Sequence, residues 1–157
     1  MSQNFIIADS GCLIALERID RLDILSALFG EVWIPPAVSQ EFSRSLSWLK
    51  VVTPKDQGMV TALKLSVDDG EAEAIALAYE YDCRLIVDDL QARKVAQHLG
   101  LQITGTLGIL ITARKRGMID SIKEVIDSLE SVGFYVSEAL KAKACELAGE
   151  VFGGAIR

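Results

Sequence analysis

Short apolar runs alternate with longer amphipathic segments along the chain. The short runs are rich in β-branched or aromatic residues and predict strands at FIIA (5–8), VWI (32–34), VVT (51–53), LIV (85–87), QIT (102–104) and FYV (134–136). The segments between them repeat apolar residues every third or fourth position and predict helices. These lie at residues 13–28, 36–42, 56–65, 70–81, 90–99, 107–116, 120–131 and 138–149.

Strand followed by helix, repeated, is typical of an α/β domain with a parallel sheet. Short, continuously apolar strands also indicate a sheet that helices cover on both faces. We therefore predict a three-layer α/β/α sandwich with a central, mainly parallel sheet. The 157 residues suit one domain, 1–157, in which residues 118–157 add a C-terminal extension of helices and a strand.

Composition excludes several classes of protein. Half of the residues are hydrophobic, which suffices for a large core, yet no run of about 18 apolar residues predicts a membrane span. The start, MSQNFIIADS, does not resemble a signal peptide. The three cysteines are far apart and form no C-x-x-C, which favours buried thiols in a reducing cytoplasm over disulfides or a zinc site.

The net charge of −6 disfavours a general nucleic-acid coat, and it makes the positions of the acids important. Asp9 follows the first predicted strand, and the pair Asp88-Asp89 follows the strand at 85–87. Glu41 lies on the helix after the second strand, and Glu71 lies in the first turn of the helix at 70–81. Because parallel α/β sheets bind ligands at the carboxyl ends of their strands, the sequence predicts an acidic site there.

Helical spacing separates Glu71 from its neighbour Glu73. Glu71 shares a stripe with Ala74 and Ile75, so it should face the sheet. Glu73 lies about 200° around the helix and should face outward, although a wide site could still use it. A purely structural role is the alternative for each acid. Asp68 with Glu71 matches a capping box, and aspartates 9 and 89 stand where helix N-caps are expected. Glu41 by itself would be an ordinary solvated helix residue.

Several carboxylates at one edge of a sheet favour a bound cation. Two of them about 5 Å apart repel by about 3 kcal/mol at an effective dielectric constant near 20. An oxygen-only set, without His or Cys, suits Mg²⁺ or Mn²⁺. A divalent ion held by carboxylates in such a cleft suggests phosphoryl-transfer chemistry.

Four segments together resemble the PIN domain, a metal-dependent nuclease fold. They are IIADSGCLIAL, EVWIPPAVSQEF, DDGEAEAIALAYEYDCRLIVDD and ITGTLGIL, and they lie within residues 5–117. The tail GFYVSEALKAKACELAGE resembles a prokaryotic branch of this family whose members often lack an assigned substrate. The resemblance implies a cytoplasmic endoribonuclease that uses Mg²⁺ or Mn²⁺ to hydrolyse RNA, as the toxins of toxin–antitoxin pairs do.

The resemblance also implies roles for individual residues. Asp9, Glu71 and Asp89 would hold metal, with Asp88 as the alternative fourth acid, and Glu41 would orient the attacking water. The family usually has Asp where Glu71 stands, and the adjacent aspartates leave the fourth ligand open.

Four further residues are candidates for contact with the substrate. Ser10 matches the small hydroxyl residue that the family has beside its first acid, and Thr106 stands where the family often has a polar group. Arg93 and Lys94 follow the aspartate pair by one helical turn, so they could meet phosphates near the metal. The basic run 114–116 closes a helix, where the helix dipole favours cations in any case.

RNA is the implied substrate, and a small antitoxin protein and a homodimer are the implied partners. Three other hypotheses stay open. An inactive PIN-like module would bind RNA or protein, and a phospho-accepting receiver domain would also carry aspartates at its strand ends. A serine hydrolase would need His98, the one histidine of the chain, as a base for Ser10.

Overall fold

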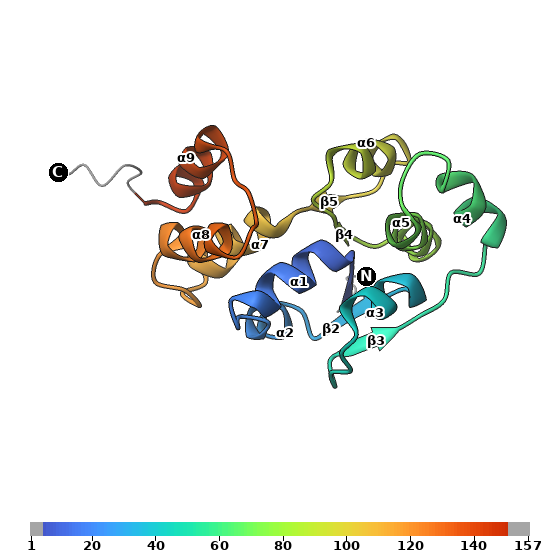
Figure 1. Ribbon diagram of the computed structural model, residues 1–157, viewed down its shortest axis with the longest axis horizontal. Coiled ribbons are helices and arrows are strands. Elements are labelled where there is room, and N and C mark those ends of the chain that lie inside the picture. The colour runs from blue at the N-terminus through green and yellow to red at the C-terminus, as the bar shows by residue number, and fades with distance from the viewer. Residues whose placement is uncertain (1–4, 151–157) are drawn as a thin grey trace.

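The structure, a computed structural model, describes residues 5–150 (Figure 1). The elements follow one another in the order β1 (Phe5–Ala8), α1 (Ser10–Arg18), α2 (Asp23–Leu28), β2 (Glu31–Ile34), α3 (Pro36–Phe42), β3 (Leu49–Val51), α4 (Gln57–Leu63), α5 (Asp69–Tyr81), β4 (Leu85–Ile86), α6 (Leu90–His98), β5 (Ile103–Thr104), α7 (Thr106–Lys115), α8 (Ile122–Ser131) and α9 (Glu138–Leu147).

The strands form one sheet in the order β3-β2-β1-β4-β5, and every pairing in it is parallel. Ile7, in the middle strand, pairs with Trp33 on one side and Leu85 on the other. The β-branched strands predicted from the sequence therefore lie side by side as a parallel sheet, and the predicted three-layer α/β/α fold is confirmed.

Alternate residues of the strands face two different helical layers. Ile6, Ala8 and Ile86 pack with residues of α1, α2, α3 and α7 on one face. Ile7 and Leu85 pack with α5 and α6 on the other. These side chains are fully buried, and each large aliphatic one contributes about 1.5–3 kcal/mol by leaving water. Both faces of the sheet are therefore committed to the core, which leaves its edges for binding.

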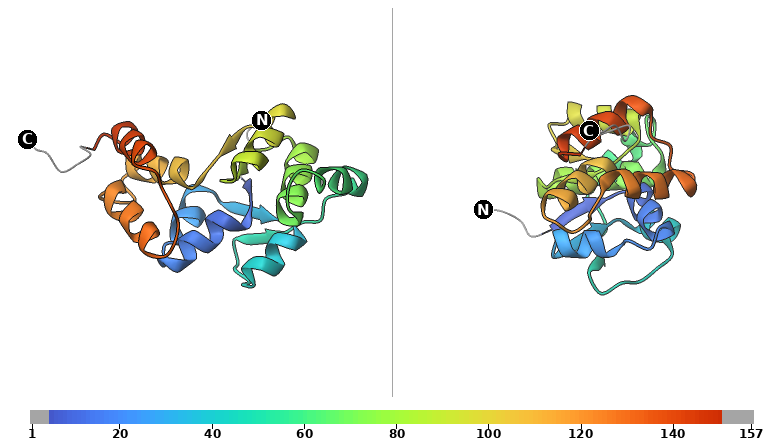
Figure 2. Two further views of the ribbon diagram at one scale, coloured as in Figure 1. Left: turned by 45° about the horizontal axis from the view of Figure 1, so that its top comes forward. Right: turned by 90° about the vertical axis from the view of Figure 1, so that its left-hand side faces the viewer.

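Helices α7, α8 and α9 pack against one another on the side of the molecule that carries α1 and α2 (Figure 2). The strand predicted at 134–136 is wrong, because this stretch has no regular secondary structure. A pocket lined by Ile103 and Thr104 of β5 and by residues 133–136 lies between the two segments. The backbone of 134–136 therefore does not extend the sheet.

Two other elements differ from the sequence prediction. The helical pattern of residues 13–28 is split into α1 and α2 by a turn in which Asp20 adopts a left-handed conformation, with φ of 57°. Strand β3 begins before the predicted run at 51–53, because Leu49–Val51 pair with β2 in register. No helix in residues 5–150 is long and apolar enough to cross a membrane.

Strand order excludes a receiver domain. Receiver domains belong to the flavodoxin-like group of doubly wound folds, whose strand order is 2-1-3-4-5. Here the order is 3-2-1-4-5, so the point at which the chain changes direction across the sheet lies between β1 and β4. The aspartates after these two strands therefore meet at that switch point.

Candidate active site

The carboxyl ends of β1 and β4 lie next to each other at the switch point of the sheet. The backbone N–H of Asp9 donates to the carbonyl oxygen of Ile86 at 3.0 Å, which holds the two strand ends together. Asp9 leaves β1 at this point, and Asp88 and Asp89 leave β4. Ligands of open α/β sheets bind in the crevice outside such strand ends, so this is where a site is expected.

Asp9 is the most strongly perturbed carboxylate of the site. It occupies the N-cap position of α1, but its side chain makes no capping hydrogen bond to the helix. Burial, and to a smaller extent the nearby carboxylates of Glu71, Asp68 and Glu41, raise the pKa of Asp9 from 3.8 to about 7, against the opposing effect of the Ser10 N–H. A half-buried acid that shares its surroundings with three others is a functional-site candidate on physical grounds.

Glu71 is part of a helix cap and also lies near the other acids of the site. Its N–H donates to Asp68 Oδ1 at 2.8 Å, and its Oε1 accepts from the Asp68 N–H at 3.1 Å, so the predicted capping box is confirmed. Its side chain is nonetheless buried toward the site, and burial followed by the charges of Asp68, Asp89 and Glu41 raises its pKa. Because the cap uses one carboxylate oxygen, the second remains for another contact.

Gly70 lets Glu41 and Asp9 approach the first turn of α5. A Cβ atom at Gly70 would stand 2.9 Å from Glu41 Oε1 and 3.5 Å from Asp9 Oδ1. The carboxylates of α3 and of the β1 end therefore meet at the N-terminal turn of α5, one residue before Glu71. The structure thus brings Asp9, Glu41 and Glu71 together, although they are separated by about 30 residues each in the sequence.

The adjacent aspartates have different surroundings. Asp88 Oδ1 accepts from the backbone N–H of Thr106 at 2.8 Å, and Asp88 Oδ2 accepts from the Thr106 hydroxyl at 2.6 Å. Asp89 is exposed, and its Oδ2 accepts from the Ala92 N–H at 3.0 Å as the N-cap of α6. Asp88 therefore ties β4 to the start of α7, whereas Asp89 keeps one oxygen outside its cap.

The candidate ligands are all carboxylates, and carboxylate oxygens are the ligands that hard divalent ions such as Mg²⁺ prefer. Within residues 5–150, however, no three Asp, Glu, His or Cys side chains are placed so that they could hold a metal ion. Two of the candidate ligands, Glu71 and Asp89, each have one carboxylate oxygen held at a helix end by a capping hydrogen bond. Binding of an ion would require the carboxylates to turn toward one another from these positions.

The predicted substrate residues fall into two groups. Ser10 begins α1 beside Asp9, and Arg93 lines a pocket with the adjacent aspartates and donates from Nη1 to the Val87 carbonyl at 2.8 Å. Lys94 is exposed on α6. Thr106 requires a correction, because it has no exposed surface and both of its donors bind Asp88. It positions that aspartate and does not meet the solvent.

The serine-hydrolase hypothesis is wrong on geometric grounds. His98 closes α6, and its Nδ1 pairs with the carbonyl oxygen of Lys94 at 2.9 Å. The helix starts at the carboxyl edge of the sheet and extends about 13 Å away from it, whereas Ser10 lies at that edge. His98 therefore lies at the far end of α6 from the carboxyl edge of the sheet, where the Ser10 hydroxyl that it would have to activate is located.

Glu73 was expected to face outward, and this expectation is also wrong. Its Oε1 accepts from the backbone N–H of Ala37 at 3.0 Å and so caps the first turn of α3. The signal in the sequence is Pro35-Pro36, because α3 begins after a residue that carries no capping side chain. A residue from another helix therefore supplies the acceptor.

Comparison with known protein families agrees with the geometry. A family model described as a PIN domain matches residues 5–150, and the chain therefore belongs to the PIN-domain family. PIN domains are generally nucleases and usually use divalent metal ions. No curated protein matches the chain.

Proposed function

We propose that this PIN domain is a divalent-metal-dependent endoribonuclease. The observation that carries the proposal is the meeting of Asp9, Glu41 and Glu71 at the first turn of α5, next to the switch point of the sheet. Burial and mutual repulsion raise the pKa of Asp9 to about 7, and a bound cation would offset both effects. Phosphodiester hydrolysis is the reaction that such a carboxylate-held ion supports best.

The residues divide between holding the ion and positioning the reactants. Asp9, Glu71 and Asp89 would hold Mg²⁺ or Mn²⁺, and Asp89 suits this role better than Asp88, whose two oxygens already accept from Thr106. Glu41 is exposed and would orient the attacking water. When bound, the ion lowers the pKa of water and polarises the phosphate. Ser10 and Arg93 would contact the RNA backbone beside it.

The proposal extends to a biological setting, for which the resemblance to toxin-type PIN domains is the support. A toxin of a toxin–antitoxin pair, acting in the cytoplasm, would bind a small antitoxin protein and form a homodimer. The burial of all three cysteines as free thiols suits a reducing compartment. Sedimentation of the purified chain, alone and after co-expression with the product of any neighbouring small reading frame, measures both partners directly.

Cleavage and metal binding should be measured together. Wild type is incubated with labelled single-stranded and hairpin RNAs in Mn²⁺, in Mg²⁺ and in chelator, beside Asp9→Asn and the control Asp20→Asn, which removes an exposed carboxylate in the turn after α1. We expect cleavage only with metal, a loss of at least about a hundredfold in Asp9→Asn, and no loss in the control. Mn²⁺ at about a hundred times its dissociation constant should stabilise wild type by about 2.7 kcal/mol.

The alternative function is an inactive module that binds RNA or a protein. One observation favours it, namely that Glu71 and Asp89 serve as caps in the structure. In that case Mn²⁺ would leave the unfolding temperature unchanged and wild type would cleave no RNA. Cleavage by Asp9→Asn at the wild-type rate would equally contradict the proposed site.

A further inference from the structure

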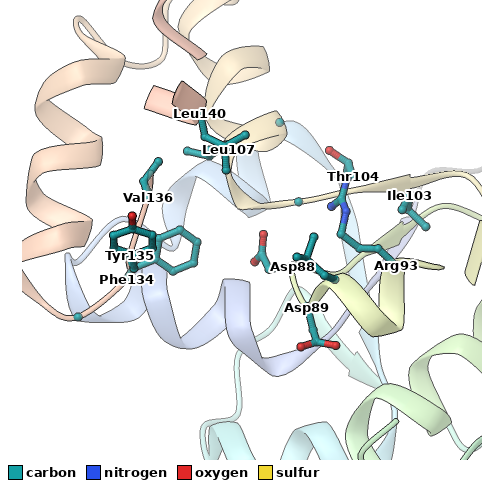
Figure 3. A pocket seen from close by; sticks show the side chains of 14 residues that line it. Asp88, Asp89, Arg93, Ile103, Thr104, Leu107, Phe134, Tyr135, Val136 and Leu140 are labelled. Atoms are coloured by element: carbon teal, nitrogen blue, oxygen red, sulfur yellow. The ribbon is translucent and has the colours of Figure 1, made fainter. Parts of the chain in front are cut away.

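A pocket of about 710 Å³ opens beside the candidate acids, between the sheet and the C-terminal helices (Figure 3). Asp88, Asp89 and Arg93 line one part of it, and Phe134 and Tyr135, from the loop between α8 and α9, line another. Figure 3 shows the two aromatic rings on the opposite side of the pocket from Arg93. The proposed nuclease site does not use these rings.

The pocket is continuous with the acidic edge of the sheet. Asp88 and Asp89 line the pocket, and Asp89 is also one of the charges that raise the pKa of Glu71. A strand of RNA whose phosphate lies at the acids can therefore extend directly into the pocket. Its size is typical of sites for small flat groups and is too small for a folded protein partner.

The two aromatic residues of the pocket differ in their exposure. Phe134 is half-buried and packs against the core, which fixes the loop, whereas Tyr135 beside it is 84% exposed. An exposed ring on an anchored loop offers a flat face to a ligand at little cost in conformational freedom. On the other side, the Arg93 guanidinium is held by its hydrogen bond to Val87. Aromatic rings and guanidinium planes are the groups on which proteins stack unpaired bases.

We infer that this pocket binds an unpaired base of the RNA strand, next to the phosphate at the acids, by stacking it on Tyr135. The inference rests on the proposed function and adds that the substrate is single-stranded at this position. A base inside a duplex has both faces covered by its neighbours, so it could not lie against the ring. The C-terminal residues that follow α8 thus take part in selecting the substrate.

Binding without catalysis tests the inference. The affinity of the full chain for a labelled single-stranded oligoribonucleotide is measured by fluorescence anisotropy in chelator, where no cleavage occurs. Tyr135→Ala should weaken binding by roughly 5- to 150-fold, the range for loss of one base–aromatic stack. Tyr135→Phe keeps the ring and should bind like wild type, whereas Tyr135→Leu keeps an apolar side chain and should be as weak as Tyr135→Ala.

Two further measurements separate stacking from other effects. Tyr79→Ala removes another tyrosine, 53% exposed on α5 and outside the pocket, and should change nothing. A series of oligonucleotides with one abasic position each should contain one position at which the base loss and Tyr135→Ala are not additive. Unchanged unfolding temperatures would show that the variants are folded.

Each outcome decides one of the two proposals. If Tyr135→Ala binds RNA like wild type while wild type cleaves RNA with Mn²⁺, the inference fails and the proposed nuclease stands. If Tyr135→Leu retains binding, or if Tyr135→Ala alters only the oligomeric state, the pocket is an apolar protein interface and the inference is overturned. If wild type cleaves nothing but shows the Tyr135 effect, the inference stands and the chain is a binding module.

Discussion

Replacing the carboxylate of Asp9 by the neutral amide of Asn tests the physical state of the site without any substrate. Burial, together with the charges of the neighbouring carboxylates, raises the pKa of Asp9 from 3.8 to about 7. At about 1.4 kcal/mol for each pKa unit, ionised Asp9 destabilises the folded state by about 4 kcal/mol relative to the unfolded chain. Because the surrounding carboxylates share this effect, the value is an upper bound for a single substitution.

The sign of the pH dependence follows from which state holds the proton. Between about pH 4 and pH 7 the folded protein keeps Asp9 protonated, whereas the unfolded chain has released that proton. The contribution of Asp9 to the stability of wild type therefore falls as the pH rises through this window and is lowest above it. Asn carries no charge at any pH, so Asp9→Asn should gain on wild type as the pH rises.

Thermal and urea unfolding in chelator at pH 4.5 and pH 8 measure this difference. We expect the unfolding temperature of Asp9→Asn to gain up to about 10 °C on that of wild type between pH 4.5 and pH 8. This value assumes about 2–4 °C for each kcal/mol in a chain of this size. Asp20→Asn is the control, since its position is exposed and its left-handed backbone tolerates Asn. An Asp9→Asn advantage that is the same at both pH values would refute the buried, repelled carboxylate.

Two further predictions concern the contacts that hold the site and the C-terminal helices in place. Thr106→Val should lower the free energy of unfolding in urea by about 1.5–3 kcal/mol, because it removes the hydroxyl that donates to the Asp88 carboxylate. Thr106→Ser keeps a hydroxyl and should restore the stability. Equal stability of all three proteins would contradict the contact. Glu150→Gln should cost about 2 kcal/mol at pH 7, since Glu150 accepts from Arg114 Nε and from the Ile122 N–H at the start of α8. Burial raises the pKa of Glu150, but the hydrogen bonds from the backbone and from Arg114 lower it overall, so its contribution is present above the unfolded pKa of 4.5 and is lost as the pH falls through the lower folded value. A gap between Glu150→Gln and wild type that persists in acid would argue against this assignment.

The sequence predicted those features of the structure that depend on residues close together along the chain. Its hydrophobic periods predicted the parallel sheet, the helices that cover it and the edge at which the acids stand. The capping box was predicted from the three-residue spacing of Asp68 and Glu71, and the N-cap of Asp89 from its place just before the helix at 90–99. In each case the interacting groups lie within one helical turn, so local geometry is sufficient.

Prediction failed where a partner lies far along the chain. Residues 134–136 have the composition of a strand, but a strand also needs an unpaired neighbour, and a pocket separates them from β5. Glu73 points to a helix that precedes it by more than 30 residues, and Thr106 is occupied by an aspartate 18 residues away. No periodicity along the sequence encodes such pairs.

The sequence by itself determined the type of domain, the strands and helices that build it, and the set of acids available at one edge of the sheet. Tertiary structure alone decided the strand order, and with it the switch point that places Asp9 beside the end of β4. It also decided which aspartate of the adjacent pair is tied to Thr106 and which aromatic residues border the site. The physical reason is that helices, caps and strand ends depend on short-range contacts, whereas the packing of layers depends on which distant surfaces exclude water together.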